Sequence, residues 1–186
     1  MPNSPPGEPQ SGQAQEPERR GIRICRAGPA DWATLREVRL AALADSAAAF
    51  GSTVERERAF DEAEWRRRAA LPWFLAWHGD EPVGIVAALS LTRPADGDPN
   101  PSWGLFSMWV APAFRGGGVA EQLAAAVVKH ARGAGAARLI LWVADGNDRA
   151  RAFYLRLGFR PTGARQTYQR QDGTELHENE LALDFS

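Results

Sequence analysis

The stretch VAPAFRGGGVAEQL, residues 110–123, places an arginine and three consecutive glycines in front of an alanine-rich run typical of a helix. The first backbone N–H groups of a helix have no partner within it, and the helix dipole adds partial positive charge there. Glycine lets such amides converge and removes the Cβ atoms that would keep a phosphate at a distance. The stretch therefore favours an anion site, although glycines after Pro112 also suit a plain strand-to-helix turn.

The segments on either side of this stretch predict a βαβ unit. Residues 103–112, WGLFSMWVAP, form an apolar run closed by a proline, and residues 138–144, RLILWVA, are almost continuously apolar, as in a strand buried on both faces. Because a helix ending near residues 132–137 would connect these two strands, we expect them to be parallel.

The rest of the chain predicts a mixture of short strands and helices. Residues 45–60 have weak periodicity and predict a loop or a broken helix, and residues 93–102 are dense in Pro, Gly and Asp and predict a loop. Further strands are expected at 21–27, 73–79, 82–91, 159–170 and 175–185, and further helices at 28–45, 61–70 and 147–158.

Length and composition predict one folded domain with a tail. Residues 1–20 contain five prolines and scarcely any large apolar side chain, so they cannot offset the entropy of ordering and are expected to be disordered. The remaining residues, 21–186, fit a single domain with a sizeable core.

Charge and cysteine content exclude several classes of protein. A net charge of −1 and a single RGG give no reason to expect a nucleic-acid partner. With no apolar run of about 18 residues and no secretion signal, we expect a cytoplasmic protein without a membrane segment. Cys25 is the single cysteine, expected to be buried in a strand, and the three histidines lack metal-ligand spacing, so neither a disulfide nor a metal is expected.

Two motifs identify a resemblance to a known family. The chain has neither a P-loop nor a dinucleotide-binding G-x-G-x-x-G turn. Residues 110–123 instead resemble the acyl-CoA-binding motif of the GNAT superfamily of N-acyltransferases: Arg or Gln, two residues, Gly, one residue, Gly or Ala. Arg115, Gly118 and Ala120 fill this pattern in order. A second family motif is matched by Asn147, Ala150, Phe153, Tyr154, Gly158 and Phe159.

The resemblance implies a fold and a cofactor. The fold would be mixed α/β, with a mostly antiparallel sheet of about seven strands, about four helices and a splayed parallel strand pair at the cofactor site. Amides at 115–120 would hold the pyrophosphate of acetyl-CoA, and backbone groups at 108–110 would pair with its pantetheine arm as an added strand. The implied cofactor contacts are Met108, Trp109, Val110, Arg115, Gly116, Gly117, Gly118, Val119, Ala120, Asn147, Ala150 and Arg156.

The chemistry of acyl transfer requires a proton donor for the thiolate and a home for charge on the carbonyl oxygen. Tyr154 matches the family tyrosine beside the thiol and is expected to be the general acid, with packing against Phe153 as its alternative role. A backbone N–H near Val110 is the expected oxyanion donor. The run SWGLFSMWV holds no carboxylate to act as base, so a water chain or a residue of the loop at 45–60 must serve. Glu55 is the candidate from this loop, although Glu55 and Glu57 are more simply explained as exposed surface charges. Glu55 and Phe50 are also the candidate contacts of the acceptor.

The leading hypothesis is an enzyme that moves an acetyl group from acetyl-CoA to the primary amine of a small molecule by direct transfer. The alternatives are a protein N-terminal or lysine acetyltransferase, or a noncatalytic acyl-CoA sensor. Carboxylates in residues 45–64 and 93–100 would draw in a cationic amine, although nearby arginines dilute this field. Because many relatives pair through strands or helices, the resemblance also admits a homodimer.

Overall fold

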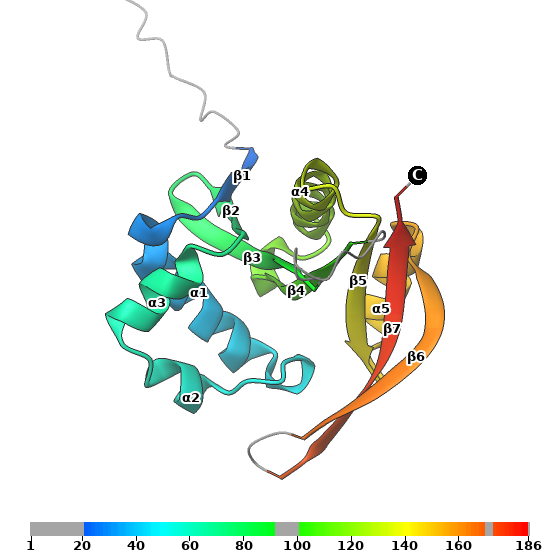
Figure 1. Ribbon diagram of the computed structural model, residues 1–186. Helices are drawn as coiled ribbons and strands as arrows, with labels where there is room; N and C mark the ends of the chain where they lie inside the picture. Colours follow the sequence, from blue (N-terminus) through cyan, green and yellow to red (C-terminus); the bar gives the residue numbers. More distant parts are fainter. Residues whose placement is uncertain (1–20, 92–100, 170–172, 186) are drawn as a thin grey trace, which may run out of the picture.

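The computed structural model describes residues 21–91, 101–169 and 173–185. The expected tail at 1–20 and most of the expected loop at 93–102 lie outside the described residues. One mixed sheet of seven strands runs through the molecule in the order β1-β2-β3-β4-β5-β7-β6 (Figure 1). Its strands are β1 (Ile22–Arg26), β2 (Trp73–His78), β3 (Glu81–Ser90), β4 (Ser102–Val110), β5 (Arg138–Ala144), β6 (Arg160–Gln169) and β7 (Glu175–Asp184).

Five α-helices accompany the sheet in the described chain, one more than expected. The additional helix is short and lies within residues 45–60, where Thr53 accepts a hydrogen bond from the Arg56 amide and so caps a single turn and a half. No described helix is both long and apolar enough to cross a membrane. The helices are α1 (Trp32–Asp45), α2 (Val54–Arg58), α3 (Glu62–Ala69), α4 (Val119–Gly133) and α5 (Asp148–Arg156).

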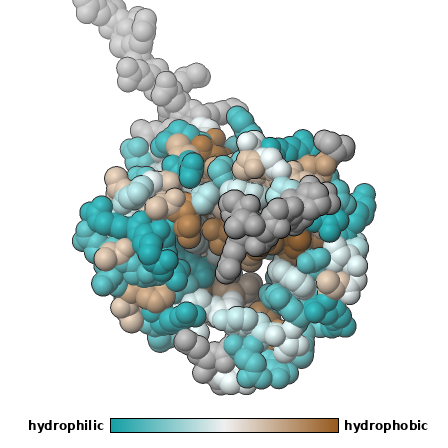
Figure 2. All heavy atoms as spheres, viewed as in Figure 1, coloured by the Kyte–Doolittle hydropathy of each residue, from teal (hydrophilic) through white to brown (hydrophobic). Residues whose placement is uncertain are grey.

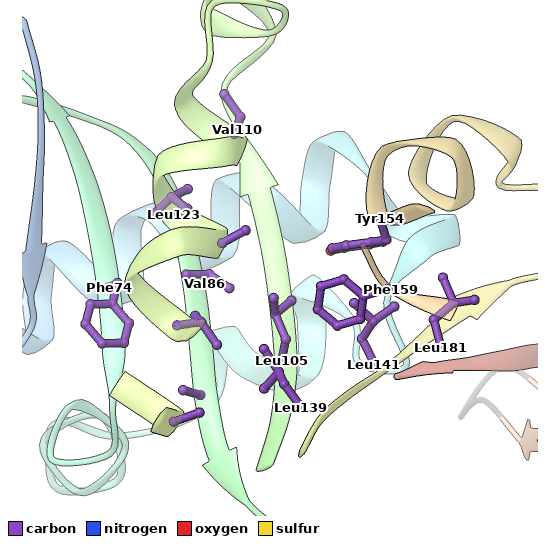
Figure 3. Close-up of a cluster of buried hydrophobic side chains, with 14 of the residues drawn as sticks. Phe74, Val86, Leu105, Val110, Leu123, Leu139, Leu141, Tyr154, Phe159 and Leu181 are labelled. Atoms are coloured by element: carbon purple, nitrogen blue, oxygen red, sulfur yellow. The ribbon is translucent and has the colours of Figure 1, made fainter. Parts of the chain in front are cut away.

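Two hydrophobic clusters lie on opposite faces of the sheet. On β3, Ile85 belongs to the cluster beneath α1 and α3, whereas its neighbour Val86 belongs to the cluster beneath α4, because successive strand side chains point to opposite faces. Figure 3 shows the second cluster, in which Leu123 of α4 points at the sheet and Tyr154 of α5 lies near Phe159. Both faces are covered by helices, which explains the nearly continuous apolar runs in the central strands.

The sheet opens in its middle, between β4 and β5. All other neighbouring strands are antiparallel, and these two are parallel. Their register covers only Ser102–Gly104 against Arg138–Ile140, although β4 runs on to Val110 and β5 to Ala144. The expected mixed sheet with a splayed parallel pair is therefore confirmed.

A β-bulge bends β4 where the strands separate. The register between β3 and β4 shifts between Ile85 and Ala87, opposite Ser107. Ser107 has φ 57° and is the only described non-glycine residue with a positive φ. Bulges commonly turn a strand away from its neighbour, so the bulge and the splay are two aspects of one feature.

Candidate cofactor and acceptor site

Two cavities meet in the gap between β4 and β5. The glycine-loop cavity, about 490 Å³, is lined by residues that include Arg115, Gly116 and Ala120. The hairpin cavity, about 300 Å³, reaches the β6–β7 hairpin. In Figure 2 apolar surface lies in the middle of the viewed face, between more hydrophilic surfaces. Residues that line both cavities are Ala49, Phe50, Met108, Asn147, Ala150 and Tyr154.

The glycine loop leaves open space at the start of α4. Gly116 and Gly118 both have φ 81°, in the left-handed region that glycine adopts without strain. A Cβ added at either residue would meet no atom within 4 Å. Gly118 is the residue before the first turn of a 15-residue helix, whose first amides have no partner within the helix. In the loop before it, the amides of Arg115 and Gly117 donate to the carbonyls of Pro112 and Phe114. The loop therefore fits an anionic group that approaches the backbone closely.

Arg115 is held by the protein itself. Its Nε donates to the Val110 carbonyl at 2.9 Å, and its Nη2 donates to the Asp45 carboxylate. Asp45 also accepts from Ser46 Oγ at 2.6 Å and from Trp109 Nε1 at 2.9 Å. The hydrogen bonds from Ser46, Trp109 and Arg115 outweigh partial burial and lower the pKa of Asp45 to about 2. Arg115 thus braces the loop against the end of α1, in addition to supplying charge beside it.

The backbone of Val110 faces the gap. Ala111 N–H donates to Val83 O on β3 at 2.9 Å. Because neighbouring residues of a strand present their backbone groups to opposite sides, the N–H and C=O of Val110 point away from β3. The bond from Arg115 Nε to the Val110 carbonyl agrees with this direction. Val110 N–H is therefore placed on the side of the gap.

Asn147 and Tyr154 bring α5 to the junction of the cavities. Asn147 Oδ1 accepts from the Ala150 amide at 3.2 Å and caps the helix. Tyr154 is 7% exposed, and its ring centroid lies 5.0 Å from that of Phe153 and 5.6 Å from that of Phe159. Burial raises the pKa of Tyr154 well above its ordinary value, so its phenol stays protonated. The ring thus packs in the core and also lines both cavities.

A buried ion pair between Arg39 and Glu57 lies behind the hairpin cavity. The sequence pattern did not predict that these two residues pair. Arg39 lines the cavity and donates to Glu57 through Nε at 3.0 Å and Nη2 at 2.8 Å, and through Nη1 to Ser107 Oγ at 3.3 Å. Glu57, expected to be a surface charge, is 1% exposed. Burial would raise its pKa, but Arg39 outweighs this and, with Ser52 and Arg68, keeps the pKa of Glu57 below its usual value. The pair therefore stays charged and fixes the bulge.

The opposite wall of the hairpin cavity comes from β6 and β7. Gln166 Nε2 donates to Glu178 Oε2 at 2.7 Å across the hairpin, and both side chains line the cavity. Tyr168 lines it as well, and its ring lies so close to Gly51 that a Cβ there would be 3.0 Å from the ring. The segment after α1 thus meets the hairpin and closes the cavity on that side.

A family model described as the Acetyltransferase (GNAT) family matches residues 39–159, well over half of the chain. The chain belongs to the GNAT acetyltransferase family. The match runs from Arg39 of the buried ion pair to Phe159 beside Tyr154, so it includes both motifs and the strands β4 and β5. Strands β6 and β7 of the hairpin cavity lie outside it.

The chain is also similar to individual GNAT proteins, at 16–36% sequence identity. A mycothiol acetyltransferase of Salinispora arenicola is 33% identical over 69% of this chain and 43% of its own length. The chain spans less than half the length of the curated relatives that it matches. The solved ribosomal-protein-alanine N-acetyltransferase of Brucella melitensis is 24% identical with a TM-score of 0.66, over 88% of this chain and 99% of that one. Arabidopsis thaliana NAA60, solved with acetyl-CoA, is 16% identical with a TM-score of 0.65, over 89% and 99%.

The GNAT motif residues predicted from the sequence lie around the glycine-loop cavity, although not all of them line it. Trp109, Val110 and Arg156 line the glycine-loop cavity with the residues already described. Gly117, Gly118 and Val119 form the loop and the helix start without being lining residues. Glu55 is exposed on α2 and lines neither cavity.

Cys25 is half-buried in β1, where its Sγ accepts from Arg23 Nη1 at 2.8 Å. Among the described residues no group of His, Cys, Asp and Glu is arranged to hold a metal.

Proposed function

We propose that this GNAT protein transfers an acetyl group from acetyl-CoA to the primary amine of a small molecule. The observation that carries the proposal is the gap in the sheet. β4 and β5 part after Gly104 and Ile140, and the space between them joins the glycine loop to Tyr154 and the hairpin cavity. A cosubstrate entering from one side and an acceptor entering from the other would meet at Tyr154.

The glycine-loop cavity has the features that coenzyme A requires. Amides of residues 115–120 would bind the pyrophosphate, since no Cβ of Gly116 or Gly118 obstructs it. Backbone groups of Met108–Val110 would pair with the pantetheine arm as an added strand, and Asn147 and Ala150 would line its other side. Arg149 and Arg156 of α5 line the same cavity and would attract the negatively charged nucleotide end.

Acetyl-CoA would supply a thioester whose carbonyl and sulfur need stabilisation as the amine attacks. Val110 N–H, which faces the gap, would donate to the carbonyl oxygen where negative charge develops. Tyr154 would donate its phenolic proton toward the departing thiolate. Because burial raises the pKa of Tyr154 above that of a thiol near ~8.5, full transfer costs about 1.4 kcal/mol per unit of mismatch. A strong hydrogen bond to the thiolate, completed by transfer as product leaves, is the role this environment favours.

The amine needs no dedicated base in this scheme. Glu55, the weak candidate from the sequence, is exposed and lies outside the lining of either cavity. Glu57 is buried and bonded to Arg39 through both oxygens. A free-amine fraction exists at neutral pH, and its proton would leave to water through the open side of the gap.

A protein acceptor is the second candidate, favoured by the similarity to a ribosomal-protein-alanine N-acetyltransferase. The contact of Tyr168 with Gly51 argues for the smaller acceptor, because it closes the hairpin cavity at about 300 Å³. A noncatalytic acyl-CoA sensor would use the glycine-loop cavity alone. The first two functions consume acetyl-CoA together with different acceptors, whereas a sensor binds acyl-CoA without consuming it.

Release of free thiol from acetyl-CoA, measured with a panel of small amines and with peptides that carry a free N-terminus, tests the proposal. We expect thiol release that depends on a small amine and yields an equal amount of acetylated amine. Release with peptides only would replace the proposal by protein acetylation. Binding of coenzyme A by calorimetry without any thiol release would indicate a sensor.

A further inference from the structure

The hairpin cavity carries one uncompensated charge among its described lining residues. Its charged side chains are Arg39 and Glu178. Arg39 is neutralised by the two-point bond to Glu57 behind the wall. Among the residues that the structure describes, Glu178 accepts from the neutral amide of Gln166 and forms no ion pair with a cation. The described lining of this cavity therefore carries one carboxylate without a counter-charge, on β7.

The remaining walls of the hairpin cavity are largely apolar. Its volume of about 300 Å³ is at the lower end for small-molecule sites. Gly51 and Tyr168 close it on one side. Apolar residues of four strands and of the segment after α1 line it: Phe50, Phe106, Leu141, Trp142, Tyr168 and Leu176.

From this arrangement we infer that Glu178 draws in the acceptor as a cation and that the acceptor is a compact monoamine with an apolar body. Its ammonium group would lose one proton to water through the open side of the gap before the neutral nitrogen attacks the thioester. The inference rests on the proposed function and narrows its substrate class. A carboxylate in partly apolar surroundings binds an ammonium group strongly, whereas the walls bury the hydrocarbon. A polyamine would bring further cations against walls whose described part offers one free carboxylate. An acidic acceptor would meet Glu178 with like charge.

The chain offers a matched control for Glu178. Glu175 also lies on β7 and also accepts from a β6 glutamine, with Gln169 Nε2 at 2.9 Å from its Oε1. It does not line the cavity. Glu178→Gln and Glu175→Gln therefore remove the same charge from the same kind of cross-strand pair, inside and outside the cavity. Glu178→Asp keeps the charge and shortens its reach, which provides a second variant.

The test is calorimetric titration of 2-phenylethylamine, spermidine and 3-phenylpropanoate into the protein saturated with coenzyme A. We expect 2-phenylethylamine to bind at least ten times more tightly than the other two. Loss of a charge-assisted contact should weaken its binding to Glu178→Gln about 10- to 100-fold. Glu178→Asp should be intermediate, and Glu175→Gln should stay within twofold of the parent. Equal binding by the two Gln variants, or tighter binding of spermidine, would overturn the inference.

Turnover separates this inference from the proposed function. With acetyl-CoA, Glu178→Gln should raise KM for 2-phenylethylamine by the same factor while KM for acetyl-CoA stays unchanged. If the parent protein binds 2-phenylethylamine in a Glu178-dependent way but releases no thiol, the proposed function fails and the assignment of Glu178 stands. If thiol is released with small amines but both Gln variants behave as the parent, the function stands and Glu178 is not the cation site.

Discussion

The two ends of the gap are built in different ways. At the glycine-loop end, the proposed site consists of backbone groups of residues 115–120, and the glycines there leave open space where a side chain would otherwise stand. At the hairpin end, side chains from α1, α2, β4, β6 and β7 form the site, and the backbone only positions them. The first end should therefore be sensitive to a Cβ added at Gly116 or Gly118, which have positive φ, and the second to the loss of a charge or ring.

The largest expected effect is a loss of stability at the hairpin end when the buried ion pair is broken. Glu57→Gln leaves the Arg39 guanidinium buried without a counter-charge, which we expect to cost about 3–5 kcal/mol of unfolding free energy. Denaturant unfolding measures this loss. Glu55→Gln removes an exposed carboxylate from the same helix and should change stability by less than about 0.5 kcal/mol. Equal unfolding free energies of Glu57→Gln and Glu55→Gln would show that the Arg39–Glu57 pair does not stabilise the fold.

The second effect concerns Tyr154, where the two ends meet. Tyr154→Phe keeps the packed ring and removes the phenolic proton, so kcat should fall on the order of 100-fold, with KM for acetyl-CoA nearly unchanged. Tyr168→Phe is the control, because Tyr168 lines only the hairpin cavity. An unchanged kcat in Tyr154→Phe would remove this residue from the chemistry.

A smaller effect separates two neighbouring glycines of the loop. Gly118→Ala places a Cβ on a residue with φ 81°, which costs about 1–2 kcal/mol and disfavours the converging amides. We expect KM for acetyl-CoA to rise about tenfold. Gly117 has no positive φ, and its added Cβ would make an ordinary contact at 3.4 Å with Phe114 O. Gly117→Ala should therefore bind acetyl-CoA more nearly as the parent does; the reverse order would contradict the assigned loop geometry.

The smallest effect follows the brace between Asp45 and Arg115 into acid. Since folding lowers the pKa of Asp45 from 3.8 to about 2, its contribution is complete above about pH 4 and is lost as the pH falls through 2. The carboxylate is partly exposed, so about 1 kcal/mol is expected. Denaturant unfolding of the parent and Asp45→Asn from pH 5 to 2 should show their difference shrink with acid. A constant difference would mean that Asp45 acts without its charge.

The same contrast explains what the sequence could predict. Strand and helix order, the parallel pair and the glycine loop depend on periodicity and on neighbours in the chain, and the structure shows all of them. Tyr154 and Asn147 belong to one short motif, which placed them on one helix face at the gap. The fold elements that the structure confirms are therefore those that depend on residues contiguous in the sequence, whereas the roles of Tyr154 and Asn147 stay predictions.

The hairpin end could not be predicted because its partners are remote in the sequence. Glu57 stands in a run of alternating charges, VERER, whose pattern is that of a surface. Only the packing of α2 against α1 buries it beside Arg39, 18 positions earlier. Glu178 and Gln166 alternate with other polar residues on β6 and β7, and nothing local distinguishes them from Glu175 and Gln169.

The short parallel register of Ser102–Gly104 with Arg138–Ile140 is the backbone pairing that joins the two halves of the sheet. Within each half, all neighbouring strands are antiparallel. A molecule of acetyl-CoA bound in the gap would contact both halves and so form a second connection between them. At a hundredfold excess over its dissociation constant it would add about 2.7 kcal/mol to the free energy of unfolding. The stability of the protein would then depend on the concentration of acetyl-CoA, its proposed cosubstrate.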